Sequence, residues 1–221
     1  MNNSRGMTPF AGPAVGDVSL PGSKSHTNRA LLCAALSEGT SRLSGVLFAD
    51  DTEAMLEAIA SLGATVEVDR ENLEIEVTGL AGPPNFRDLV IDARLSGTTS
   101  RFLLPTLAAG NGIVTLDGAP QLRSRPIAEQ IDALRDLGCD LEELGAPGQL
   151  PLRVSSRGLE GGEVEISAET SSQFVSGLML AAPLYKEGLK IRLTGLPVSR
   201  PYLELTVKVM RDFGVSVEKP D

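Results

Sequence analysis

The chain has 221 residues, of which 42% are hydrophobic, and it carries a formal net charge of −9 at pH 7. This length can bury a substantial core, whereas the acidic balance argues against nucleic-acid binding, which needs clustered lysine and arginine. The single histidine argues against a histidine-based metal site or catalytic triad, and no apolar run reaches the roughly 18 residues of a membrane span. We therefore expect a cytoplasmic protein without nucleic-acid or membrane partners.

Residues 1–13 are polar and contain glycine and proline, so we expect a flexible arm there. A first unit of pattern βαβαββ follows, with these expected elements: a strand at 15–20, a buried helix at 25–37, a strand at 41–47, an amphipathic helix from residue 50, and strands at 65–69 and 73–78. We interpret Asp50 and Asp51 as first-turn acids of the amphipathic helix rather than as catalytic groups. Gly63 is expected to end that helix.

The same order of elements is expected twice more. The second unit has a strand at 89–92, a buried helix at 98–109, a strand at 113–116, a helix at 126–137 with Pro126 at its first position, and strands at 140–144 and 152–155. The third has a strand at 163–167, a buried helix at 172–185, a strand at 190–194, a helix at 201–213 and a strand at 215–218. Its closing strand is missing from the pattern, so we expect that the chain is truncated or is completed by another polypeptide.

Marker residues show that the three units are an internal repeat. Similar apolar segments open at Arg29, Arg101 and Gln173, in steps of 72 residues (101 − 29 and 173 − 101). The tripeptide Ser-Arg-Pro occurs at 124–126 and again at 199–201. Repetition at a fixed period is typical of a repeated supersecondary unit. The predicted fold class is therefore α/β, a pseudo-threefold domain over residues 14–221 with repeats at about 14–79, 87–156 and 162–221, the last incomplete.

The starts of the buried helices carry groups that bind anions. Lys24 and Ser25 open the first buried helix, and Arg29 lies on the same helical face as Ser25. Small hydroxylic residues or glycine precede the other two, at 97–100 and 170–172. Free N–H groups at a helix start favour an anion. A pseudo-threefold arrangement would bring these starts together, with Lys24, Arg29 and Arg125, into a site for a dianion.

Five segments together resemble the 5-enolpyruvylshikimate-3-phosphate synthase family: PGSKSHTNRALL, SGTTSRFL, SRPI, ETSSQFVSGLMLAAP and VSRPYLELT. The similarity runs in collinear order from about residue 15 to the end. It implies two similar domains of three βαβαββ units each, of which this chain would be the N-terminal one. It also implies transfer of the enolpyruvyl group of phosphoenolpyruvate to the 5-hydroxyl of shikimate 3-phosphate, with release of phosphate and without a metal or organic cofactor.

Carried over by position, the resemblance implies how shikimate 3-phosphate is held. Lys24 would touch both substrates. Ser25 and Arg29 would hold the shikimate moiety, Arg29 through its carboxylate, for which a guanidinium fork is suited, and Tyr202 would lie against the ring. The 3-phosphate would accept hydrogen bonds from three serines: Ser171, Ser172 and Ser199.

The same resemblance implies a phosphoenolpyruvate site. Arg125 would bind this substrate, Gln173 would lie between the two substrates, and Gly97 would leave room, so that a side chain there would crowd phosphoenolpyruvate and the inhibitor glyphosate. Lys24, Arg125 and Gln173 are the predicted catalytic residues. General acid and base groups would belong to the second domain, the C-terminal partner that is absent from this chain.

Some residues depart from the family pattern or allow another interpretation. Leu95 stands where many members have asparagine, and Phe102 where proline is frequent. We interpret Arg101 as a structural brace and Arg200 as a surface arginine. Two alternatives stay open: the related UDP-N-acetylglucosamine enolpyruvyl transferase, which commonly has a cysteine in the loop equivalent to 119–124, where this chain has none, and a non-catalytic anion-binding domain.

Overall fold

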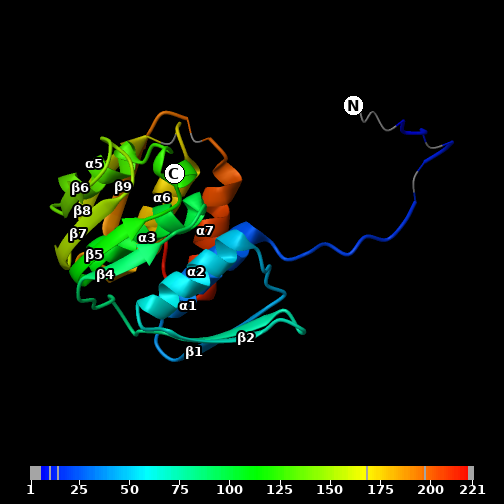
Figure 1. Cartoon of the computed structure of the whole chain (residues 1–221), viewed down its shortest axis with the longest axis horizontal. Coiled ribbons are helices and arrows are strands. Elements are labelled where there is room, and N and C mark those ends of the chain that lie inside the picture. The colour runs from blue at the N-terminus through cyan, green and yellow to red at the C-terminus, as the bar shows by residue number, and fades with distance from the viewer. Residues whose placement is uncertain (1–5, 10, 14, 168, 197, 219–221) are drawn as a thin grey trace.

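The computed structural model describes residues 6–9, 11–13, 15–167, 169–196 and 198–218, in which three groups of helices and strands follow one another (Figure 1). The predicted arm at 1–13 lies partly outside the described residues. Its described part contains no helix or strand and is exposed, and Figure 1 shows the N-terminal segment extending away from the rest of the chain. In the described part of the chain, no helix is both long enough and apolar enough to cross a membrane.

The first unit forms an antiparallel sheet in the order β1-β3-β2 with two helices. Its elements are α1 (Lys24–Leu36), β1 (Thr40–Ser44), α2 (Asp50–Ser61), β2 (Thr65–Asp69) and β3 (Glu74–Thr78). The Ser23 side chain caps α1 by accepting a hydrogen bond from the His26 N–H group. Asp50 and Asp51 lie in the first turn of α2, as predicted, where negative charge is favourable.

The predicted strand at residues 15–20 is wrong. These residues pair with no strand that the structure describes, and Val15, Val18 and Leu20 are almost fully exposed. Alternating apolar residues indicate a strand only where a neighbouring strand and a covering layer are available. In the described part of the chain, no strand pairs with residues 15–20 and no layer covers their apolar side chains.

The second unit forms a four-stranded sheet in the order β4-β5-β7-β6, with β4 parallel to β5 and the other pairs antiparallel. Its elements are β4 (Leu89–Asp92), α3 (Gly97–Ala109), β5 (Asn111–Asp117), α4 (Pro120–Arg123), α5 (Ala128–Asp136), β6 (Asp140–Glu143) and β7 (Leu152–Arg157). The position predicted for Pro126 is wrong, because α5 begins only at Ala128. The N–H group of Ile127 instead donates to the Gly148 carbonyl at 2.9 Å, which keeps this segment outside the helix.

The third unit has two parallel strands and two long helices: β8 (Gly162–Ser167), α6 (Ser172–Ala181), the 3₁₀ turn η1 (Ala182–Leu184), β9 (Leu189–Thr194) and α7 (Arg200–Asp212). The α-helix predicted at 172–185 changes to a 3₁₀ turn at Pro183, which has no N–H group to continue it. The strand predicted at 215–218 is also wrong, since no described strand pairs with it and the Val215 N–H group donates to the Met210 carbonyl at 3.0 Å.

One apolar core joins the three units, running from Leu31 in α1 to Met210 in α7. As predicted, α1, α3 and α6 are interior helices, and 12 of the 13 residues of α3 are buried. The contact between α3 and α6 is close because a methyl group on Gly177 would lie only 2.2 Å from the Arg101 carbonyl oxygen. This packing fixes the starts of α3 and α6 side by side.

Candidate anion-binding site

A pocket of about 430 Å³ opens where four helices begin. Its wall is formed by residues at or near the starts of α1, α3, α6 and α7. The N–H groups of several helix starts therefore lie around one space. The lining residues are Lys24, Ser25, Arg29, Thr98, Arg101, Thr170, Ser171, Ser172, Gln173, Val198, Ser199 and Tyr202. Almost all of them are polar or cationic, which suits an anionic ligand.

Eight of the ten predicted site residues line this pocket: Lys24, Ser25, Arg29, Ser171, Ser172, Gln173, Ser199 and Tyr202. The other two lie beside it. A methyl group on Gly97 would lie 3.2 Å from Nη1 of Arg125 and 3.8 Å from Nη1 of Arg101, which is itself a lining residue. Residues from three repeats thus meet in one place.

Arg29 is a buried cation, with only 2% of its surface exposed. Its Nε donates to Oγ1 of Thr206 at 2.7 Å, and its Nη1 donates to the Ser25 carbonyl at 2.8 Å. The guanidinium also lies 4.8 Å from the centre of the Phe102 ring, so the residue at this departure from the family pattern supplies an aromatic face. Burial lowers the pKa of Arg29 to about 10, which shows that its positive charge is poorly solvated.

Arg101 sets the orientation of Gln173. Its Nη1 donates to Oε1 of Gln173 at 2.6 Å, and Nε2 of Gln173 donates to Oγ1 of Thr98 at 3.1 Å. Burial, and then the neighbouring Arg125, lower the pKa of Arg101. The interpretation of Arg101 as a brace was therefore incomplete, because this side chain also lines the pocket.

Lys24 has a carboxylate partner, since Nζ of Lys24 lies 2.5 Å from Oδ2 of Asp51. Asp51 lies in the first turn of α2, and its carbonyl accepts a hydrogen bond from Oγ1 of Thr99 at 3.1 Å. It was predicted only as a first-turn acid. The structure shows that Asp51 also forms an ion pair with Lys24, which lines the pocket.

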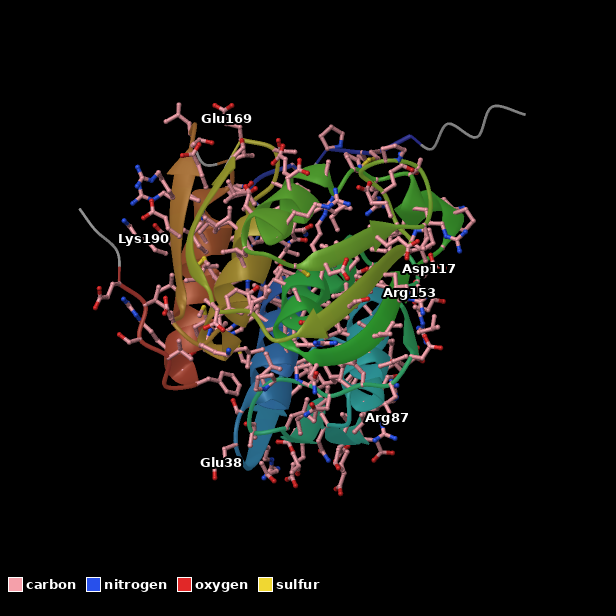
Figure 2. The ribbon with its side chains drawn as sticks, turned by 90° about the vertical axis from the view of Figure 1, so that its left-hand side faces the viewer. Glu38, Arg87, Asp117, Arg153, Glu169 and Lys190 are labelled. Atoms are coloured by element: carbon pink, nitrogen blue, oxygen red, sulfur yellow. The ribbon has the colours of Figure 1, made fainter. Side chains whose placement is uncertain are left out.

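The pocket guanidiniums differ from most other cations of the protein in having no carboxylate neighbour. Arg123 pairs with Asp117 at 2.6 Å and Lys190 pairs with Glu163 at 2.8 Å, and Figure 2 shows Asp117 and Lys190 at the outside of the fold. Among the residues described, no salt bridge forms to the two arginines that line the pocket, Arg29 and Arg101, or to Arg125 beside it. Three cations without a neutralising carboxylate favour binding of an anion with more than one negative group.

The predicted phosphate-binding serines lie at two helix starts. Ser171 is the N-cap of α6, and its Oγ accepts a hydrogen bond from the Gln173 N–H group at 3.2 Å. Ser199 is the N-cap of α7 and has φ +64°, a left-handed conformation that non-glycine residues seldom adopt. Such strain is frequent at binding sites. Across the described ranges, no group of three or more His, Cys, Asp or Glu side chains is arranged to hold a metal ion.

The chain is similar in sequence and in fold to known proteins of one family. The family model of EPSP synthase (3-phosphoshikimate 1-carboxyvinyltransferase) matches residues 11–221. The 3-phosphoshikimate 1-carboxyvinyltransferases of Shewanella pealeana and Erwinia tasmaniensis are 42% and 43% identical to the chain over 207 residues, which is 93% of the chain but only 49% and 48% of those proteins. A solved EPSP synthase from Acinetobacter baumannii matches with a TM-score of 0.81 and 25% identity, over 93% of this chain and 45% of that one. The chain thus spans about half the length of these relatives.

Proposed function

The chain belongs to the EPSP synthase (3-phosphoshikimate 1-carboxyvinyltransferase) family, and on that premise we propose that it supplies the shikimate-3-phosphate-binding half of such an enzyme. The reaction is transfer of the enolpyruvyl group from phosphoenolpyruvate to the 5-hydroxyl of shikimate 3-phosphate, with release of phosphate. We assign residues 14–221 to one domain and a second, C-terminal half to its partner. The observation that carries the proposal is the pocket at four helix starts, with two guanidiniums in its wall and a third beside it that have no carboxylate partner among the described residues.

Shikimate 3-phosphate would place its two anionic groups at opposite parts of the pocket. The phosphate fits the start of α6, where Ser171 and Ser172 offer hydroxyl and N–H groups, with Ser199 at the start of α7 beside it. Tyr202 is 45% exposed in the pocket wall and can lie along the ring. The carboxylate then faces Arg29.

Arg29 has less hydrogen-bonding capacity left than an exposed arginine. Of its five N–H groups, those on Nε and Nη2 are directed at Thr206, Ser176 and the Tyr202 carbonyl, and one on Nη1 is directed at the Ser25 carbonyl. One N–H group on Nη1 remains. A two-pronged grip on a carboxylate therefore requires release of the longest bond, 3.4 Å from Nη2 to the Tyr202 carbonyl.

The phosphoenolpyruvate side would use Lys24, Arg125 and Gln173. In the addition, the 5-hydroxyl loses its proton as its oxygen bonds to C2, and the methylene carbon gains a proton. The resulting tetrahedral intermediate then loses phosphate from C2 and a proton from the methyl carbon, which re-forms the double bond. The cations hold the substrate's negative charge throughout and Gln173, fixed by Arg101, positions the reacting groups. We assign the proton transfers to the partner half, since no carboxylate is among the described residues that line the pocket.

Two measurements test the proposal. Titration of shikimate 3-phosphate into the chain should give saturable binding, and it should be weak, because the family closes two domains around its ligand. Mixing the chain with a separately expressed C-terminal half of a 3-phosphoshikimate 1-carboxyvinyltransferase should restore phosphate release that neither part shows alone. A folded mixture with no turnover would favour the alternative of a non-catalytic anion-binding domain, and absence of saturable binding would count against both.

The remaining expectations stay predictions. The second enzyme alternative commonly has a cysteine in the loop equivalent to 119–124, where this chain forms α4 and has none. A cytoplasmic location, and the absence of nucleic-acid and membrane partners, follow from composition alone. Fractionation of cells that express the protein would test them.

A further inference from the structure

Two buried hydroxyl groups behind the pocket contact Arg29, and neither was a predicted site residue. Thr206 in α7 and Ser176 in α6 are both 0% exposed. Oγ1 of Thr206 accepts from Nε of Arg29 at 2.7 Å, Oγ of Ser176 accepts from Nη2 at 3.2 Å, and the two oxygens lie 2.9 Å apart. Three helices therefore meet at one guanidinium.

We propose that Thr206 and Ser176 are positioning residues that fix the plane of the Arg29 guanidinium and so make the pocket select a ligand with a carboxylate beside a phosphate ester. The inference rests on the proposed function and deepens it. An arginine side chain has several rotatable bonds, and the two hydroxyls occupy its Nε edge and one Nη. They thereby determine which N–H group is left for the ligand.

The chemical nature of the two groups matters as much as their position. The acceptors of Arg29 among the described residues are hydroxyl and carbonyl oxygens, which carry no charge: Thr206, Ser176, the Ser25 carbonyl and the Tyr202 carbonyl. A carboxylate at the same place would neutralise Arg29 and remove its attraction for an anion. Neutral acceptors compensate part of the cost of burying the guanidinium, while its charge stays available to the ligand.

Both hydroxyls lie on buried and largely apolar helix surfaces. Ser176 lies in an apolar interior helix, and Thr206 lies on the buried face of α7, next to Val207 and Val209. A hydroxyl at such a position needs a hydrogen-bond partner, because a buried polar group without one destabilises the fold. Thr206 also lies 2.8 Å from the Tyr202 carbonyl, so it connects Arg29 to the helix turn that carries the exposed tyrosine.

Thr106 in α3 provides a matched control. It is also 0% exposed, and its Oγ1 donates to a carbonyl four residues earlier, that of Phe102, at 3.2 Å, but it makes no hydrogen bond to Arg29. Thr206→Val and Thr106→Val therefore remove the same atoms from equally buried helix positions. Only the first removes an acceptor from the guanidinium.

The experiment titrates the full chain and its variants with shikimate 3-phosphate and, separately, with inorganic phosphate, which has no carboxylate. Thr206→Val should weaken shikimate 3-phosphate binding about tenfold, the effect of losing a hydrogen bond to a charged group, and leave phosphate binding within about twofold. Ser176→Ala should act in the same direction, and Thr206→Ser should restore binding. Thr106→Val should change neither affinity.

A second readout does not depend on a ligand. In the wild-type chain the Nε–H proton of Arg29 should give a resolved NMR signal that exchanges slowly with water, because it is buried and hydrogen-bonded. Thr206→Val should shift it and speed its exchange, whereas Thr106→Val should not. If Thr206→Val fails to fold, Ser176→Ala still removes a hydroxyl acceptor of Arg29, and Thr206→Ser serves as the variant that keeps the hydroxyl at 206.

The outcomes separate this inference from the proposed function. Wild-type chain that binds no shikimate 3-phosphate would overturn the proposed function. Wild-type chain that binds it, with Thr206→Val binding equally well, would overturn only the positioning role. Equal loss of both ligands in Thr206→Val would show a general disturbance of the pocket and would also overturn the inference.

Discussion

At the scale of single residues, Lys24 and Asp51 offer a direct test of how the pocket balances its charges. Lys24 is half-exposed and Asp51 lies 2.5 Å away, so the carboxylate competes with any anion that approaches the ammonium group. Asp51→Asn should tighten inorganic phosphate binding about two- to fivefold, the scale of a partly exposed ion pair. The same change should slow turnover in the mixture of two halves, because Lys24 loses the group that positions it.

Asp50→Asn is the control for this change. Both acids lie in the first turn of α2, so both substitutions remove the same favourable helix-start charge. Asp50 is exposed and forms no salt bridge among the described residues. If Asp50→Asn altered phosphate binding as much as Asp51→Asn, the contact with Lys24 would not be the cause.

The two cysteines should be chemically inert in the folded protein. Burial raises the pKa of Cys33 and of Cys139 to about 12, so both thiols stay protonated at neutral pH, and the thiolate is the reactive form. Because the folded pKa lies above the ordinary value of 9.0, their contribution to stability is complete below pH 9.0 and is lost as the pH rises toward 12. A thiol reagent at neutral pH should label neither cysteine in the native chain and both in denaturant. Rapid native labelling of Cys139, the buried one, would contradict this account.

At the scale of the helices, alanine at two glycines near Arg101 should have different effects, one on stability and the other on ligand binding. On Gly177 in α6 a methyl group would lie 2.2 Å from the Arg101 carbonyl, a backbone atom that cannot move without separating α6 from α3. On Gly97 it would meet the flexible end of Arg125 at 3.2 Å. Gly177→Ala should therefore lower the free energy of unfolding by about 1–3 kcal/mol.

Gly97→Ala should instead leave thermal stability almost unchanged and weaken binding of phosphoenolpyruvate, because Arg125 is displaced. Thermal unfolding followed by circular dichroism, together with phosphoenolpyruvate titration, measures both effects. Equal destabilisation by the two alanines would show that the close approach of α3 and α6 has been misjudged. Unchanged phosphoenolpyruvate binding in Gly97→Ala would remove Arg125 from that site.

The helices and the paired strands were predictable because their signals are local. Glycines, caps and apolar spacing placed α1, α2 and α3 to within one residue at their starts, and the strands at 65–69 and 89–92 were predicted with their observed bounds. The predicted strands at 15–20 and 215–218 were wrong because a strand forms only beside a neighbouring strand, and the sequence of the segment alone does not show whether one is available. The four-residue helix α4 was not predicted, because so short a segment has no apolar periodicity to indicate a helix.

The residues that line the pocket could be predicted in the same way, whereas the roles assigned to them stay predictions. The lysine, serines and arginines that line the pocket stand in recognisable motifs at helix starts. Their supporting contacts do not, because they join residues far apart: Arg29 reaches Thr206 across 177 positions and Ser176 across 147. A serine or threonine inside a helix carries no signal of such a partner until the helices are packed.

At the scale of the whole molecule, the shared core predicts cooperative unfolding. One cluster of buried apolar side chains includes helices from all three units, and α3 is almost completely enclosed by the others. Calorimetry should show a single transition, and the amides of α3 should exchange with solvent more slowly than those of α7. Gly177→Ala should lower the midpoint of that single transition. Separate transitions for the units would mean that they fold independently.

The placement of the two tyrosines has a practical consequence. The chain contains no tryptophan, so these phenol rings are its main intrinsic fluorophores. Tyr185 is buried and donates a hydrogen bond to the Pro105 carbonyl at 3.2 Å, whereas Tyr202 lies in the wall of the pocket. A Tyr185→Phe variant would leave Tyr202 as the sole emitter, and its quenching would report occupancy of the pocket in real time without any attached dye.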